Sequence, residues 1–322
     1  MKLPVLFLVA ALAAAAAEPV RIVFDTDMGN DIDDAIALAI LHALESRGEA
    51  RLLAVTLTKD TPQAAPFVDA VNTFYGRPGI PIGVVRDGKT PEPRPMLAAV
   101  VDNPAFPRRL RDGRDAPEAT GLLRRILAGE KDGSVVFVQV GFSTNLARLL
   151  ASAADAASPL SGRDLVARKA RLLSIMAGHF PAGNPEYNVR VDLPASRKVY
   201  EEWPTPIVFS GLEVGGAMLF PAASIETEFG YVAQHPVAVA YRAYKKMPYD
   251  RPTWDPTSAL FAVRPERGYF SLSPPGMVSL DAEGRTTFAP RPDGTHRILT
   301  LDPIQRARTL EAMIGLASQP PR

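Results

Sequence analysis

Short apolar runs alternate with longer segments of helical periodicity through the first two-thirds of the chain. The candidate strands are residues 20–26, 51–58, 80–85, 134–140, 171–177 and 205–210. The candidate helices between them are residues 34–46, 64–76, 117–130, 144–156 and 194–203. Strands that alternate with helices are typical of parallel βαβ units with helices on both faces of the sheet. The pattern therefore predicts an α/β fold with an open, mostly parallel, doubly wound (Rossmann-like) sheet.

The alternation ends after residue 210, and different elements are expected there. Residues 235–246 and 255–263 have helical spacing, and the sequence around Asp255 is that of a helix start followed by proline. Residues 276–300 alternate in polarity and predict a C-terminal hairpin, and residues 303–317 predict a closing amphipathic helix.

One long segment interrupts the early pattern. Residues 86–115 are rich in proline and charge, so a long surface excursion near the mouth of any site is expected there.

The first residues have the features of an export signal. Lys2 precedes an apolar run that is too short for a mature membrane span, and small residues follow up to Ala17. We expect residues 1–17 to be a cleaved signal peptide and residues 18–322 to form a single domain, located in the periplasm or secreted. No later segment approaches the roughly 20 apolar residues of a spanning helix, so no membrane partner is expected.

Composition narrows the chemistry. The chain has no cysteine, which removes disulfides, thiolate metal sites and a thiol nucleophile. The formal net charge is +1 and the basic residues are dispersed, which argues against nucleic-acid binding. A small molecule is the expected partner, and a homo-oligomer is compatible with the sequence.

Five aspartates lie within ten residues, directly between the first strand and the first helix. They are Asp25, Asp27, Asp31, Asp33 and Asp34. A helix cap and a favourable helix-dipole interaction would explain the three near the helix start, Asp31, Asp33 and Asp34. They would not explain Asp25 and Asp27 at the strand end. Ligands of open parallel sheets bind at the carboxyl ends of strands, and a hard divalent cation would turn the repulsion into attraction. Calcium or magnesium is favoured over zinc, because cysteine is lacking and the four histidines are scattered.

Two other interpretations of the cluster fit less well. An EF-hand loop counted from Asp25 would have its glycine one place early and Ile36 in place of the bidentate glutamate. A phosphotransfer enzyme of the haloacid dehalogenase type, with magnesium, also has an aspartate after a strand. Its phosphate-binding Ser/Thr and Lys are not clearly present in order, and the Asp33–Asp34 pair would be unexplained.

Four stretches together resemble one known family. "DTDMGNDIDDAIAL" is similar to the DxDPGxDDAxAL signature of the inosine-uridine-preferring nucleoside hydrolases. "VQVGFSTNLARLL", "SIMAGHFPAGNPEYNVRVDLP" and "TWDPTSALFAV" resemble three further family motifs and occur in the family's order. The resemblance spans residue 21 to about residue 263 and implies the nucleoside hydrolase type of doubly wound sheet.

The resemblance also implies a metal centre and a reaction. The ligands of a Ca²⁺ ion would be Asp27, Asp34, Asp255 and the main-chain carbonyl of Val140. The reaction would be hydrolysis of the N-glycosidic bond of ribonucleosides or related N-ribosides, giving base and ribose through an oxocarbenium-like transition state. Asp27 would be the general base that accepts a proton from the attacking water.

The remaining residues carried over from the family would hold the substrate. Asp33 would accept a hydrogen bond from a ribose hydroxyl, and Asn184, Glu186 and Asn188 would hold the sugar from the other side. Met176 would line the wall. Considered singly, Asn184 also fits an ordinary turn, Glu186 a solvated loop acid, and Met176 a core residue.

The sequence departs from the family pattern at three places. The loop between Asp27 and Asp33 is two residues longer than usual, and Asp31 in it could add an outer contact. The asparagine often found after the second strand is missing, and Lys59 or Asp60 stands nearby.

The third departure is Trp254, at the place where many family members have a histidine that protonates the leaving base. An indole cannot act as a general acid near neutral pH, although it can stack on a planar base. His179 is one substitute, although a loop histidine is more often solvated. A second function therefore stays open, namely a calcium-dependent ribose- or nucleoside-binding protein with little or no catalysis.

Overall fold

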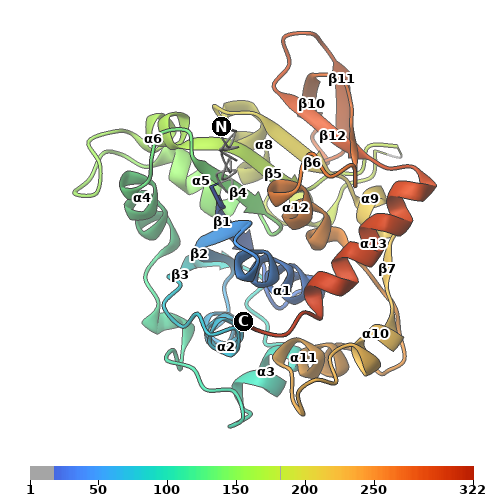
Figure 1. The fold of residues 1–322 in the computed structure, drawn as a ribbon. Helices are drawn as coiled ribbons and strands as arrows, with labels where there is room; N and C mark the ends of the chain where they lie inside the picture. Colours follow the sequence, from blue (N-terminus) through green and yellow to red (C-terminus); the bar gives the residue numbers. More distant parts are fainter. Residues whose placement is uncertain (1–17, 182) are drawn as a thin grey trace, which may run out of the picture.

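A large mixed sheet runs through the molecule (Figure 1). The structure is a computed structural model that describes residues 18–181 and 183–322, so the predicted signal at residues 1–17 lies outside the described residues. Within the described part, this sheet has ten strands: nine follow the order β11-β10-β12-β6-β5-β4-β1-β2-β3, and the tenth, β9, pairs with β12. The main strands are β1 (Val20–Thr26), β2 (Ala50–Lys59), β3 (Ile82–Lys89), β4 (Val135–Gln139), β5 (Ala170–Met176) and β6 (Ile207–Ser210).

Helices cover both faces of this sheet (Figure 1). One side carries α1 (Asp33–Ser46), α2 (Ala64–Phe74), α3 (Pro95–Val101), α11 (Pro236–Tyr244), α12 (Trp254–Val263) and α13 (Pro303–Ala317). The other side carries α4 (Ala119–Gly129), α5 (Thr144–Ala151), α6 (Gly162–Lys169) and α8 (Leu193–Glu202). The predicted doubly wound α/β fold is therefore confirmed.

Successive residues of the central strands pack alternately into two hydrophobic cores, one on each face of the sheet. On β1, Ile22 and Phe24 belong to the core beneath α1 and α12, and Val23 belongs to the core beneath α4 and α5. On β4, Val138 and Phe137 divide in the same way. Side chains of successive strand residues point to opposite faces, so a strand buried on both faces must be apolar at nearly every position.

The strand order places a switch point between β1 and β4. From β1 the chain moves outward to β2 and β3, and it then returns to the other side of β1 as β4. Connections to the two sides diverge there, which leaves a crevice at the carboxyl ends of the two strands. Asp27 follows β1 and Val140 follows β4, so both lie at this crevice.

The early helix α1 is buried on all sides. Every residue from Asp33 to Leu44 is buried, because α1 packs between the sheet and the helices α12 and α13. A helix that is apolar around its circumference is typical of such an interior position. The two aspartates in its first turn are therefore buried with it.

Two sequence predictions need correction in detail. The excursion at residues 86–115 is not only surface: it contains α3, whose Met96, Leu97 and Val100 pack into the core, after a proline at the first helical position. The helix predicted at residues 144–156 ends at Ala151, where the next residue has an extended backbone.

The C-terminal hairpin and helix are confirmed, with one addition. The strands β10 (Gly276–Leu280) and β11 (Thr286–Pro290) form the antiparallel hairpin. The following strand β12 (His296–Thr300) pairs parallel with β6 and thereby joins the hairpin to the main sheet. The predicted segment at residues 276–300 is thus a three-stranded extension of the sheet.

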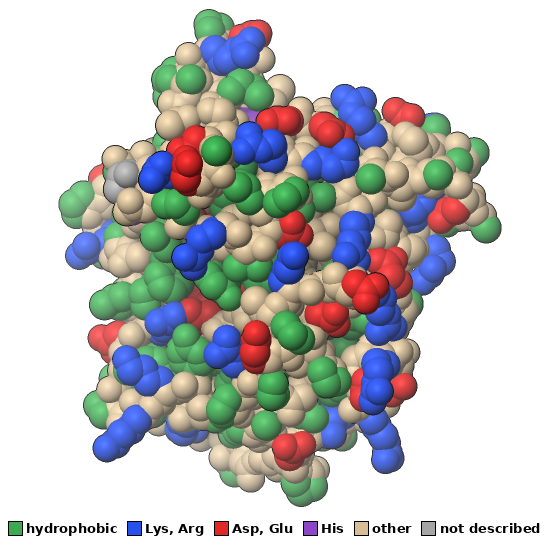
Figure 2. All heavy atoms as spheres, turned by 180° about the vertical axis from the view of Figure 1, so that it is seen from behind, with side chains coloured by type: hydrophobic (Ala, Val, Ile, Leu, Met, Phe, Trp, Pro, Cys, Tyr) green, Lys and Arg blue, Asp and Glu red, His purple; other side chains and the backbone are tan. Residues whose placement is uncertain are grey.

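The helix lengths and the surface charges bear on possible membrane and nucleic-acid contacts. Over the described residues, no helix is long and apolar enough to cross a membrane. On the face shown in Figure 2, Lys and Arg side chains are interspersed with Asp and Glu side chains.

Close approach of β1 and β4 at the crevice generates a first prediction. A Cβ atom added at Gly141 would lie 2.4 Å from the backbone nitrogen of Asp27 and 2.4 Å from Oγ1 of Thr58. We expect Gly141→Ala to lower the unfolding free energy by roughly 2 kcal/mol, because backbone must move to admit the methyl group. Urea denaturation measures this change.

The matched control is Gly129→Ala, at the end of α4, where nothing lies within 4 Å of the added atom. It should leave the unfolding free energy unchanged or raise it slightly, since alanine favours the helix. Equal destabilisation by both variants would contradict the packing argument.

Candidate active site

A cavity of about 360 Å³ opens at the crevice between β1 and β4. Its walls come from the loop after β1, the first turns of α1 and α12, and the segments after β4 and β5. The lining residues are Asp27, Asn30, Asp31, Asp33, Asp34, Arg94, Val140, Met176, Glu186, Tyr187, Asn188, Leu212, Arg251, Trp254 and Asp255. The cavity thus lies where an open α/β sheet binds its ligands.

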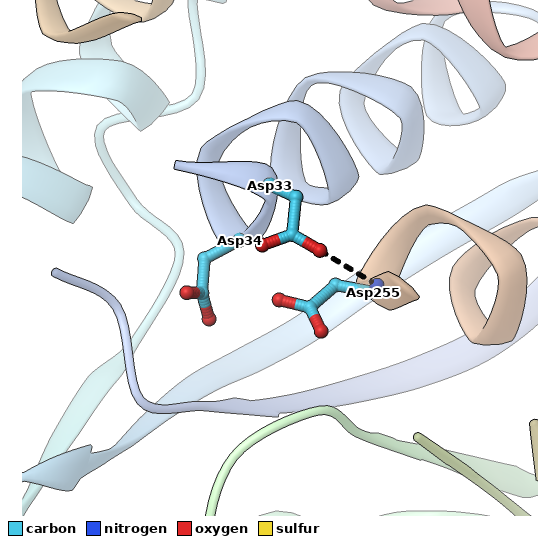
Figure 3. A group of neighbouring side chains, drawn as sticks. All are labelled: Asp33, Asp34 and Asp255. Atoms are coloured by element: carbon cyan, nitrogen blue, oxygen red, sulfur yellow. Dashed lines mark hydrogen bonds between the residues drawn. The ribbon is translucent and has the colours of Figure 1, made fainter. Parts of the chain in front are cut away.

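Three carboxylates converge at one side of this cavity (Figure 3). Asp33 and Asp34 begin α1, and Asp255 comes from the first turn of α12. Each offers an oxygen within 4.8 Å of the oxygens of the other two. Asp33 Oδ2 also accepts a hydrogen bond of 3.1 Å from the backbone N–H of Asp255, which ties the two helix starts together.

Burial and mutual repulsion disfavour the ionised forms of this cluster. Desolvation, together with the charges of neighbouring aspartates, raises the pKa values of Asp33, Asp34 and Asp255 well above the usual range. Asp34 Oδ1 accepts from the Thr26 hydroxyl, but its buried Oδ2 is without a hydrogen-bond partner among the described residues. An unsatisfied buried carboxylate oxygen beside two further acids fits a cation, and an all-oxygen donor set fits a hard divalent ion.

Asp27 and Val140 line the same cavity. Asp27 is 4% exposed, and burial raises its pKa to about 6. Its Oδ2 accepts a 2.8 Å hydrogen bond from the Asn30 side chain. The Val140 carbonyl accepts a 2.8 Å hydrogen bond from Asn188 Nδ2, and its second lone pair remains available. The four predicted ligands therefore line one cavity, although the tightest carboxylate group contains Asp33 in place of Asp27.

Glu186, Asn188 and Met176 also line the cavity, and their contacts with a substrate stay a prediction. Glu186 caps the short helix α7 (Tyr187–Val191), where its carboxylate accepts from the backbone N–H groups of Asn188 and Val189. Burial nevertheless raises the pKa of Glu186 to about 7. Asn188 is held between the Val140 carbonyl and Met176, so its amide is fixed in the cavity.

Two of the predicted substrate-binding residues, Trp254 and Asn184, are placed differently relative to the cavity. Trp254 lines the cavity, and its indole Nε1 donates a 3.0 Å hydrogen bond to the Leu212 carbonyl. Asn184 is exposed and is not among the lining residues, so its substrate contact stays a prediction. His179 does not line the cavity either.

The longer loop after β1 contributes two side chains to the wall. Gly29 adopts a φ of +110°, and a Cβ there would lie 2.6 Å from Leu97, so the turn needs glycine. Asn30 bridges Asp27 and Lys59, whose buried ammonium donates a 3.0 Å hydrogen bond to Asn30 Oδ1. Lys59 therefore reaches the site through Asn30.

The next residue of the loop, Asp31, contacts a second basic side chain, that of Arg251. Asp31 forms a two-bond ion pair with Arg251, including a 2.8 Å hydrogen bond from Nε to Oδ1. The guanidinium also lies over the rings of Tyr244 and Trp254, at 5.2 and 5.0 Å from their centroids. Burial acts to lower the pKa of Arg251, but the hydrogen bonds and charge of Asp31 outweigh it and raise the pKa.

Sequence reasoning missed several lining residues. Arg251 belongs to the two-residue strand β8 (Arg251–Pro252), which has no apolar periodicity, and Arg94 lies in the proline-rich excursion. Tyr187 adjoins two predicted residues in "EYN", so its neighbours gave a signal for it. The pairing of Asp31 with Arg251 spans 220 positions and has no local signature.

Residues 22–308 match the family described as "Inosine-uridine preferring nucleoside hydrolase". A search of curated proteins gave no match.

Solved structures share the fold at low sequence identity. The inosine-uridine preferring nucleoside hydrolase of Bacillus anthracis is 18% identical with a TM-score of 0.68, covering 92% of this chain and 99% of that one. The purine-preferring ribonucleoside hydrolase of Gardnerella vaginalis is 17% identical with a TM-score of 0.66, covering 92% and 98%. The type III effector protein XopQ, complexed with adenosine diphosphate ribose, is 17% identical with a TM-score of 0.71 and 94% coverage of both chains.

The cost of the buried carboxylates generates the second prediction. Because its pKa is raised in the fold, the ionised Asp34 opposes folding at pH 8. In EDTA at pH 8, Asp34→Asn should therefore raise the unfolding free energy by roughly 1–3 kcal/mol, since it removes an unpaired buried charge. Thermal and urea denaturation measure this difference.

Adding Ca²⁺ should make the wild type more stable than the Asp34→Asn variant. The wild type should gain stability and the variant should gain much less, because it lacks one of the carboxylates predicted to bind the ion. The control is Asp293→Asn on the exposed turn after β11, which should change neither value. A variant that is less stable than wild type in EDTA would contradict the account.

Proposed function

Because the chain belongs to the inosine-uridine preferring nucleoside hydrolase family, we propose that it is a calcium-dependent hydrolase of ribonucleosides or related N-ribosides. Its class is that of glycosidases acting on N-glycosyl bonds. The observation that carries the proposal is the convergence of Asp33, Asp34 and Asp255 in a cavity that also contains Asp27 and the Val140 carbonyl.

The ligand set proposed for the ion is Asp27, Asp34, Asp255 and the Val140 carbonyl. The unsatisfied Oδ2 of Asp34 and the all-oxygen character of the set support calcium, with magnesium as the alternative hard ion. When bound, Ca²⁺ would neutralise the acids, grip the ribose 2′ and 3′ hydroxyls and make a water molecule more acidic.

The protein's own residues then have distinct tasks. Asp27 takes the proton of the attacking water, and Asn30 keeps the Asp27 carboxylate oriented through their 2.8 Å hydrogen bond. Asp33 accepts from a ribose hydroxyl, while Glu186 and Asn188 hold the sugar from the opposite wall. The C1′–N bond breaks, the water oxygen bonds to C1′, and the carboxylates favour the positive charge that develops on the ribose.

Trp254 is proposed to stack on the leaving base. Its indole N–H is already bonded to the Leu212 carbonyl, so its contribution is the apolar face of the ring. Export of the protein, with residues 1–17 as a cleaved signal and residues 18–322 as one mature domain, stays a prediction.

The third prediction tests the reaction and its metal. Purified protein with Ca²⁺ should release ribose from inosine or uridine, and EDTA should reduce the rate by at least about 100-fold. Restored Ca²⁺ should recover it. The 2′-deoxy analogues should react poorly, because they lack one hydroxyl of the proposed clamp.

Release of phosphate from phosphate esters would instead identify a phosphatase. Saturable binding of nucleosides without ribose release would identify a binding protein. Either result would overturn the hydrolase.

The fourth prediction separates chemistry from binding at Asp27. Asp27→Asn should lower kcat for inosine by about 100-fold or more, since an amide cannot take the proton of water. Asp293→Asn is the matched surface control and should retain wild-type kcat. Calorimetric titration of Ca²⁺ into each protein gives the accompanying loss of metal affinity.

A further inference from the structure

N-glycosidic cleavage leaves an electron pair on the departing base, so a side chain that donates to the base is needed. In the described chain, all four histidines lie away from the lining, and the Trp254 N–H is occupied by the Leu212 carbonyl. Glu186 accepts backbone hydrogen bonds at both carboxylate oxygens, so it acts as an acceptor. The lining residues that remain as donors include Arg94, Tyr187 and Arg251, and of these three Arg251 lies over the Trp254 ring.

Arg251 has the position and the chemistry for this task. It lines the cavity, and its guanidinium lies 5.0 Å from the centroid of the Trp254 ring on which the base would stack. Asp31 occupies Nε and Nη2. Among the described residues, no acceptor is hydrogen-bonded to Nη1, so the guanidinium retains free N–H donors.

The surroundings fix this guanidinium. A two-bond pair with a carboxylate sets its plane, and the Tyr244 and Trp254 rings lie beside it. A donor held in advance stabilises developing charge more than one that must reorganise. Asp31 comes from the longer loop after β1, so the residue that positions Arg251 lies within the segment that departs from the family pattern.

We propose that Arg251, positioned by Asp31, donates a hydrogen bond to the leaving base and stabilises the negative charge that develops there. The inference rests on the proposed hydrolase function and assigns its leaving-group step. As the C1′–N bond breaks, its electron pair passes to the base. The water oxygen bonds to C1′ and its proton goes to Asp27. The base takes its proton from solvent, and Arg251 keeps its own throughout.

The test compares two leaving groups in one variant. Inosine leaves as a poor anion that needs stabilisation, whereas p-nitrophenyl riboside releases a stable phenolate. Arg251→Met should lower kcat/KM for inosine by about 100-fold, the cost of losing one such donor. It should lower kcat/KM for p-nitrophenyl riboside by less than about threefold.

The ratio of the two substrates is independent of how much protein folds, because both assays sample the same active enzyme. Asp31→Asn should shift the ratio in the same direction but less, since Arg251 remains. Arg291→Met, at an exposed arginine after β11, should leave the ratio at the wild-type value.

The outcomes are distinguishable. If wild type cleaves both substrates and Arg251→Met slows both by the same factor, the leaving-group role is wrong and the hydrolase stands. If wild type cleaves neither substrate with Ca²⁺ present, the proposed function itself fails.

Discussion

Repulsion between buried carboxylates is the constraint on which the site depends. Asp33, Asp34 and Asp255 are brought together by two helix starts that are buried by core packing, so the acids cannot separate without disturbing α1 and α12. The favourable free energy of core packing around α1 and α12 maintains this carboxylate cluster, which is unfavourable by itself. A divalent cation would relieve it, which is why stability and function are expected to share the same ion.

The sheet explains why this cluster is also accessible to a ligand. At the switch point between β1 and β4 the connections diverge, so the carboxyl ends of the two strands border an open crevice. Asp27 and Val140 are the residues that follow these strands, and both line the same cavity. Glu186 and Asn188 also line the cavity, and their hydrogen bonds to nearby backbone fix their orientation.

The longer loop after β1 gives this site its individual character. Asn30 connects the Asp27 carboxylate to the buried ammonium of Lys59, and Asp31 holds the Arg251 guanidinium between aromatic rings. Asn30 thus joins Asp27 to a basic side chain from a distant segment, and Asp31 itself pairs with another. A nucleoside hydrolase with a tryptophan before its late aspartate can in this way place a fixed positive charge beside the leaving base.

The sequence alone determined the βαβ order, the aspartate cluster and its family resemblance, because strand and helix periods and contiguous motifs are local properties of the chain. It placed Asp27, Asp34, Val140 and Asp255 at one site through the resemblance, and the structure brings all four to one cavity. Only the tertiary structure decided that Asp33 joins the tightest carboxylate group, that Asn184 stays outside, and that α3 is buried. The pairing of Asp31 with Arg251, 220 positions away, was likewise visible only in the tertiary structure. Contacts between distant segments depend on how the layers pack, and they produce no periodic pattern in the sequence.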